Sequence, residues 1–150
     1  MKGPAMSSSG KQPKGDVVSA FVVSEPVGAS EQQSQLDFEL DFFESILQRN
    51  PDYVDALRAH GNNLTLKGRY DDGLKIDRRL VDLRPQDALA HYNLACSYSL
   101  VKKVDPALRL LRRALELGYL DFDYMREDRD LAFVRKDRRF RKLLREFENI

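Results

Sequence analysis

The sequence predicts an all-α fold in which antiparallel helix pairs stack into an α-solenoid. The main observation is an internal repeat, because residues 54–87 align without a gap on residues 88–121. Small residues recur at matching places, Gly61 with Ala95 and Gly73 with Ala107. Pro51 and Pro85 have the same separation. A fixed period in this range is typical of repeat arrays in which each unit is one supersecondary element.

The first 30 residues predict a disordered tail ahead of one helical domain over residues 31–150. They hold four of the eight glycines (Gly3, Gly10, Gly15 and Gly28) together with many serines. Such a composition cannot bury enough apolar surface to offset the entropy of ordering the chain. Val17–Val23 differs because it is apolar and largely β-branched. Two interpretations of this segment stay open, a piece of linker and a short motif that docks on this chain or on a partner.

The domain is expected to begin with a half repeat over residues 36–53. Ser30 and Gln33 have the spacing of a capping box at a helix start. A helical apolar stripe follows at Leu36, Leu40, Phe43 and Leu47. We expect this helix to end at Asn50, because the residue before a proline avoids helical backbone angles.

The two full repeats, 54–87 and 88–121, predict four helices near residues 53–67, 70–83, 87–101 and 104–117. Asp87 and Asp105 are the expected N-caps of the last two. Pro106 suits the first turn of the final helix. Gly118 is the expected helix stop in the left-handed conformation.

Residues 122–150 depart from the repeat and predict a closing unit. Leu131, Phe133 and Val134 indicate a short helix, and a longer amphipathic helix is expected from about Asp137. Two full repeats bury their apolar faces only against neighbours. This unit is therefore expected to cap the open end of the array.

The repeat resembles the tetratricopeptide repeat (TPR) family, whose unit is two antiparallel helices in 34 residues. The resemblance rests on the small residues named above, on large residues such as Leu64 and Tyr98, and on the prolines after the second helices. His60, Asp77, Leu80 and His91 depart from the residues that the family prefers. The resemblance implies a right-handed superhelix of which the first helices line the concave face. The expected groove residues are Arg58, Asn62, Thr65, Leu89, Tyr92, Asn93, Cys96 and Ser99.

That groove favours a protein or an extended peptide as partner, in a scaffold or adaptor role. One subset of the family clamps acidic chaperone tails, and Arg58, Asn62 and Asn93 occupy three of the five clamp positions. The last two positions fall on Asp123 and Glu127, which repel carboxylates. A chaperone-tail clamp is therefore not expected, although Arg58 remains suited to some carboxylate.

No enzyme, cofactor or metal site is expected from the sequence. It contains no Gly-x-Ser-x-Gly, His-Glu-x-x-His or phosphate-binding glycine loop. The two histidines and Cys96 do not share a helix face, since His91 and Cys96 are five residues apart. We expect both histidines to be packed side chains and Cys96 to face the groove.

Charge and hydropathy limit the remaining partners. Lys and Arg (25) nearly balance Asp and Glu (24), so net charge predicts neither nucleic-acid nor membrane binding. Val17–Val23 is too short to span a bilayer, and a cytoplasmic location is expected. Two alternatives to peptide binding stay open. One is phosphate or nucleic-acid contact by the basic run at residues 135–142, and the other is an assembly subunit that self-associates.

Overall fold

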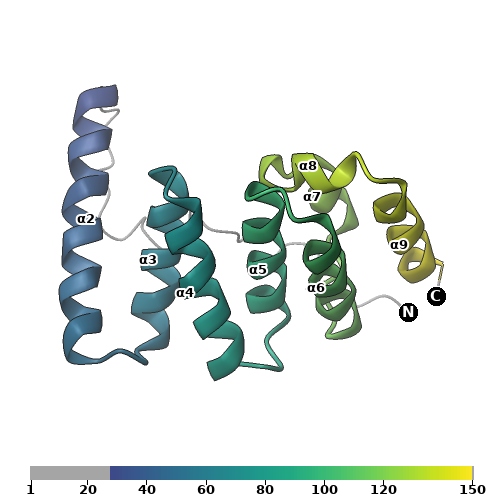
Figure 1. Ribbon diagram of the computed structural model, residues 1–150, viewed down its shortest axis with the longest axis horizontal. Helices are drawn as coiled ribbons and strands as arrows, with labels where there is room; N and C mark the ends of the chain where they lie inside the picture. The colour runs from purple at the N-terminus through teal and green to yellow at the C-terminus, as the bar shows by residue number, and fades with distance from the viewer. Residues whose placement is uncertain (1–27, 150) are drawn as a thin grey trace.

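The structure, a computed structural model, describes residues 28–149, and over this range the chain is all-helical without a strand. The helices follow one another from α2 at one end of the molecule to α9 at the other (Figure 1). Their bounds are α2 Ala29–Arg49, α3 Val54–Leu66, α4 Tyr70–Leu83, α5 Ala88–Leu100, α6 Val104–Glu116, α7 Phe122–Glu127, the 3₁₀ helix η2 Arg129–Leu131, α8 Ala132–Arg135 and α9 Arg138–Glu148. The segment Val17–Val23 lies outside the described residues.

The helices pack in adjacent pairs whose starts follow the 34-residue period. Helices α3 and α5 begin at Val54 and Ala88, and α4 and α6 begin at Tyr70 and Val104. Within each repeat the two helices pack on each other, α3 on α4 and α5 on α6, and α4 also packs on α5. The four helices predicted from the repeat are thus confirmed to within a residue or two.

Two of the turns use the left-handed conformation that glycine adopts without a Cβ penalty. Gly68 closes α3 with φ 85°, and Gly118 follows α6 with φ 104°. Lys102, at the repeat position of Gly68, has φ 63°. The Tyr119 N–H donates to the Ala114 carbonyl at 2.9 Å, which satisfies a helix-end acceptor. The prediction that Gly118 ends its helix is confirmed.

One predicted N-cap is confirmed and two are wrong. Asp87 accepts from the backbone N–H of Leu89 (3.0 Å) and Ala90 (3.2 Å) at the start of α5. Asp105 lies inside α6, whose N-cap is Lys103, and its carboxylate pairs with the Arg139 guanidinium at 2.9 Å instead. Helix α2 begins at Ala29 rather than after Ser30.

The start of α2 is set by a glutamate in its first turn. The Glu31 carboxylate accepts from the Gly28 N–H at 3.1 Å, so Gly28 takes the N-cap position that the sequence had suggested for Ser30. At the other end Asn50 is the C-cap, as predicted.

The core divides into three clusters along the row of helices. The largest joins α5 and α6 to the closing unit, with Leu111, Met125, Phe140 and Leu144 among its fully buried members. Smaller clusters join α2 to α3 and link α3, α4 and α5. The closing unit therefore shares the main core with the second repeat.

Buried polar contacts cross two of the junctions between neighbouring helices. Glu39 of α2 accepts from the Asn63 amide of α3 at 3.3 Å. Asp77 of α4 accepts from the Ser97 hydroxyl of α5. Asp77 is one of the residues that differ from the family's preference, and this hydrogen bond gives its buried carboxylate a partner. These contacts restrict how neighbouring helices can slide past one another, because a shift would leave a buried polar group unsatisfied.

The closing unit contains more helix than the sequence indicated. Asp137 caps α9 by accepting from the Arg139 N–H at 2.9 Å, close to the predicted start. The six-residue helix α7 was not predicted, and Asp121 caps it by accepting from the Tyr124 N–H at 3.0 Å. Its apolar residues are too few for a clear helical period.

Candidate binding surface on the first helices of the repeats

The eight predicted groove residues lie on two helices, α3 and α5, but they do not form one open surface. Arg58, Asn62 and Thr65 are on α3, and the other five are on α5. The side chains that are buried are Asn62, Tyr92, Cys96 and Ser99. The partly exposed ones are Arg58, Thr65, Leu89 and Asn93. The expectation that all eight are accessible is wrong for the buried four.

The closing unit covers the second half of this surface. The Tyr92 hydroxyl donates to the Asp128 carboxylate at 2.5 Å, and the Cys96 thiol lies 3.7 Å from the same oxygen. The Val134 backbone N–H donates to the Ser99 hydroxyl oxygen at 3.3 Å. The predicted face of α5 is therefore an internal interface with η2 and α8.

Aromatic packing makes this interface a fixed structural contact. The Tyr92 and Tyr119 rings stack with centroids 4.3 Å apart, and Tyr92 is fully buried. Burial is the main cause that raises the pKa of the Tyr92, Tyr119 and Tyr124 phenols above the ordinary value. These hydroxyls thus stay protonated, and Tyr92 remains a donor to Asp128.

The burial of Cys96 gives an expected result opposite to that of an open groove. In the native chain we expect iodoacetamide to modify Cys96 about 100-fold or more slowly than in denaturant, because alkylation must wait for local opening. Mass spectrometry of timed samples measures both rates. Since the chain has one cysteine, the signal has one source. Rapid labelling without loss of helical circular dichroism would show that the closing unit leaves α5 open.

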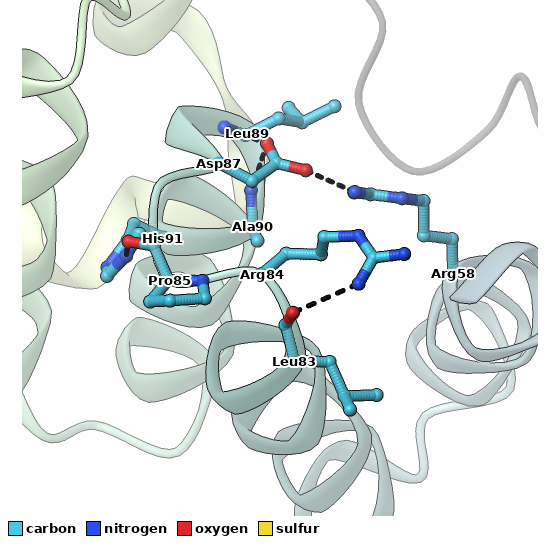
Figure 2. Close-up of polar contacts among 8 residues, drawn as sticks. All are labelled: Arg58, Leu83, Arg84, Pro85, Asp87, Leu89, Ala90 and His91. Carbon is cyan, nitrogen blue, oxygen red and sulfur yellow. Dashed lines mark hydrogen bonds and ion pairs between the residues drawn. The ribbon is translucent and has the colours of Figure 1, made fainter. Parts of the chain in front are cut away.

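The accessible part of the surface lies at the start of α3 and α5. The Arg58 guanidinium pairs with Asp87, which also caps α5 (Figure 2). The Arg84 side chain extends toward Arg58, and its Nη1 donates to the Leu83 carbonyl at 3.0 Å (Figure 2). An open depression of ≈ 550 Å³ is lined here by Asn50, Asp52, Tyr53, Val54, Asp55, Arg58 and Arg84. We call it the α3 depression.

Asn62 lies one helical turn beyond Arg58 on the same side of α3. It is 3% exposed, and neither its amide oxygen nor its amide nitrogen has a hydrogen-bond partner among the described residues. A buried polar group without a partner costs about 1–3 kcal/mol and calls for an explanation in a native structure. Asn62 does not line the α3 depression, and its unsatisfied amide lies inside the protein rather than at this surface.

Both histidines are packed side chains, as predicted. The His91 Nε2 donates to the Pro85 carbonyl at 2.8 Å (Figure 2). Burial lowers the pKa of His60 below the ordinary value. Across residues 28–149 the structure shows no group of three His, Cys, Asp or Glu side chains placed to hold a metal ion.

The basic run at residues 135–142 is partly neutralised within the protein. Arg139 pairs with Asp105 and Asp137, both at 2.9 Å. Arg135 donates to the Met125 carbonyl at 3.2 Å. These internal partners account for much of a charge run that the sequence left open as a phosphate-binding candidate.

Sequence reasoning missed two residues at the α3 depression. Asp87 was predicted only as a helix cap, and no site role was predicted for Arg84. No spacing in the sequence pairs Asp87 with Arg58, since the two are 29 residues apart. The departure at Asp77 was visible, but its partner Ser97 was not.

Comparison with known proteins gives a distant relative but no family. No family model matches the chain. The chain is 34% identical over 104 residues to a chloroplastic protein of Arabidopsis thaliana. The match covers 67% of this chain and 30% of that protein, so the chain spans less than a third of the relative's length. Among the described helices, none combines the length and hydropathy that a bilayer span requires.

Proposed function

We propose that this chain is a TPR-like protein-interaction module that binds an extended peptide of a partner protein at the α3 depression. The helix starts that recur every 34 residues support the repeat assignment. The proposal keeps Arg58, Leu89 and Asn93 of the predicted groove, which are partly exposed. It moves the site away from Tyr92, Cys96 and Ser99, which the closing unit covers.

The observation that carries the proposal is the pair of guanidinium groups, Arg58 and Arg84, at one open depression. Arg84 makes no ion pair with any described residue. Arg58 pairs with Asp87, but the Asp87 carboxylate also caps α5. A carboxylate entering between the two guanidinium groups would gain charge-assisted hydrogen bonds. The ligand chemistry is thus an acidic side chain or terminal carboxylate on an extended backbone.

The proposal includes no chemical step, cofactor or metal. The polar residues that line the depression are suited to recognition, and one of its two acids, Asp52, already pairs with Arg79. The name of the Arabidopsis relative describes that protein as chloroplastic. For this chain a cytoplasmic location stays a prediction from the sequence.

Selection from a random-peptide library displayed on phage tests the proposal. We expect enrichment of peptides with an acidic residue or a free carboxyl terminus. Arg84→Glu should weaken their binding by at least about tenfold, because it replaces an attraction by a like-charge repulsion. Arg58→Gln should also weaken binding, with a smaller loss. Isothermal titration calorimetry with a selected peptide measures both.

Arg109→Glu is the matched control, because Arg109 is exposed on α6 and its charge change is the same. It should leave affinity within about twofold of the parent. If Arg84→Glu and Arg109→Glu lose the same amount of peptide affinity, the effect comes from the net charge of the protein and not from this site. Selection of no acidic peptide would overturn the proposed site.

A further inference from the structure

The two ends of the molecule carry opposite charge. Helix α2 contains five acidic residues and one basic residue, whereas α9 contains five basic and two acidic residues. Figure 1 shows these helices at opposite ends of the row. The nearly neutral total charge therefore hides a polarity along the length of the chain.

The outer face of α2 combines aromatic rings with carboxylates. Phe38 is 58% exposed and Phe42 38% exposed, and their rings stack with centroids 6.2 Å apart. Asp41 and Glu44 are exposed on the adjacent turns and form no ion pair with any described residue. End units of repeat arrays normally present a polar outer face. The highly exposed Phe38 ring at this position marks an interaction surface.

The other end carries a depression of complementary character. It has a volume of ≈ 390 Å³ between α7, α8 and α9, and we call it the C-terminal cleft. Its lining consists of Arg126, Arg135, Phe140, Arg141, Leu144 and Arg145. Four of these are arginines and none is a carboxylate. Phe140 and Leu144, which are almost fully buried, form its apolar floor.

Two of the cleft's arginines lack an ion-pair partner within residues 28–149. Arg126 pairs with Glu148, and Arg135 donates to backbone carbonyls of Met125 and Asp128. Arg141 and Arg145 are exposed and form no ion pair with a described residue. These two cations are one helical turn apart, as are Asp41 and Glu44 on α2. The cleft thus offers uncompensated positive charge beside an apolar floor.

We propose that the outer face of α2 of one copy binds the C-terminal cleft of a second copy. Phe38 would pack against the side chains of the cleft's exposed arginines, while Asp41 and Glu44 would face Arg141 and Arg145. The helix-in-groove mode fits a helix of 21 residues, about 32 Å long. A second copy is the occupant because this chain supplies both the acidic helix and a cationic cleft of opposite charge.

The proposed contact joins different surfaces of the two copies, so it is heterologous. Each pair would keep one free α2 face and one free cleft, and association would continue unless the geometry closes a ring. This behaviour differs from a two-fold dimer, in which the same patch is used twice. It is also independent of the peptide proposed for the α3 depression.

Sedimentation of the full chain tests the proposal. We expect the weight-average mass to rise above that of a monomer as concentration approaches about 1 mM, without a fixed limit at the dimer. Two variants each remove one side of the contact. The first combines Phe38→Ser with Asp41→Lys, and the second combines Arg141→Glu with Arg145→Glu.

Mixing the two variants distinguishes this contact from any other. Each variant alone should stay monomeric, because it retains only one half of the contact. An equimolar mixture should form a dimer and nothing larger, since the intact cleft of the first variant can bind the intact α2 of the second. An isologous interface would not give this complementation.

Lys75→Glu with Arg78→Glu is the matched control, since both residues are exposed on α4 away from either end. It should associate as the parent does, and circular dichroism should show that every variant is folded. If a double variant fails to fold, Phe38→Ala and Arg145→Gln replace it and should reduce association at least about threefold. A monomeric parent at all concentrations would overturn the proposal. A mixture of the two variants that stays monomeric would also overturn it. The same holds if the parent does not self-associate and Arg141 and Arg145 bind an oligonucleotide instead.

Discussion

A chain that ends at Asp121 is expected to lose cooperative folding of its second repeat and to aggregate. The truncation removes Met125, Leu131, Val134, Phe140, Leu143 and Leu144, which are all buried in the main core cluster. Burying one such side chain contributes about 1.5–3 kcal/mol. The whole stability of a native protein is about 5–15 kcal/mol. The loss is therefore comparable to the total, and thermal scans by circular dichroism and light scattering should detect it.

A chain that ends at Glu148 is the control for this truncation. It lacks only Asn149, which is exposed, and Ile150. This shorter change should leave the melting temperature within about a degree or two, as expected of a surface change. If the chain ending at Asp121 stays soluble and unfolds in one cooperative step, the closing unit is not the cap of the array.

The helices of the two repeats could be predicted because the same pattern of small and large residues occurs twice in the sequence. Val54 and Ala88 open equivalent helices, and an error in one would have broken the match with the other. Local signals were less reliable where several polar residues compete for one role. Asp105 has the right residue type for an N-cap, but its partner is a distant arginine on α9. An ion pair between residues more than 30 positions apart cannot be recognised from the local spacing of residue types.

The predicted site failed where the closing unit departs from the repeat. The second half of the α5 face was expected to be open because the family resemblance implies that the first helices line a concave face. The structure covers it with short helices whose contact residue, Asp128, is 36 residues from Tyr92 and falls in no periodic register. Arg58 and Asn62 were placed on one side of α3 by helical spacing alone, which needs no tertiary information. What spacing could not reveal was how deeply Asn62 is buried.

Replacing Asp128 with alanine is expected to destabilise the protein by about 2–4 kcal/mol. The substitution leaves the buried Tyr92 hydroxyl without an acceptor, which costs about 1–3 kcal/mol. It also removes the cap of η2, where the Asp128 carboxylate accepts from the Asp130 N–H at 2.9 Å, and such caps contribute about 1 kcal/mol. Urea unfolding followed by circular dichroism measures the change. Asp123→Ala, on a 95% exposed side chain of α7, should stay within about 0.5 kcal/mol of the parent.

A double-mutant cycle separates the Tyr92–Asp128 contact from the other roles of Asp128. Tyr92→Phe removes the hydroxyl donor and keeps the ring that stacks on Tyr119. If the hydrogen bond fastens the closing unit to α5, Asp128→Ala should cost less in the Tyr92→Phe background, with a coupling of about 1 kcal/mol or more. The cap of η2 is lost in both backgrounds and cancels in the difference. Additive effects would mean that stacking and apolar burial hold the closing unit on α5, and that Asp128 stabilises only its own turn.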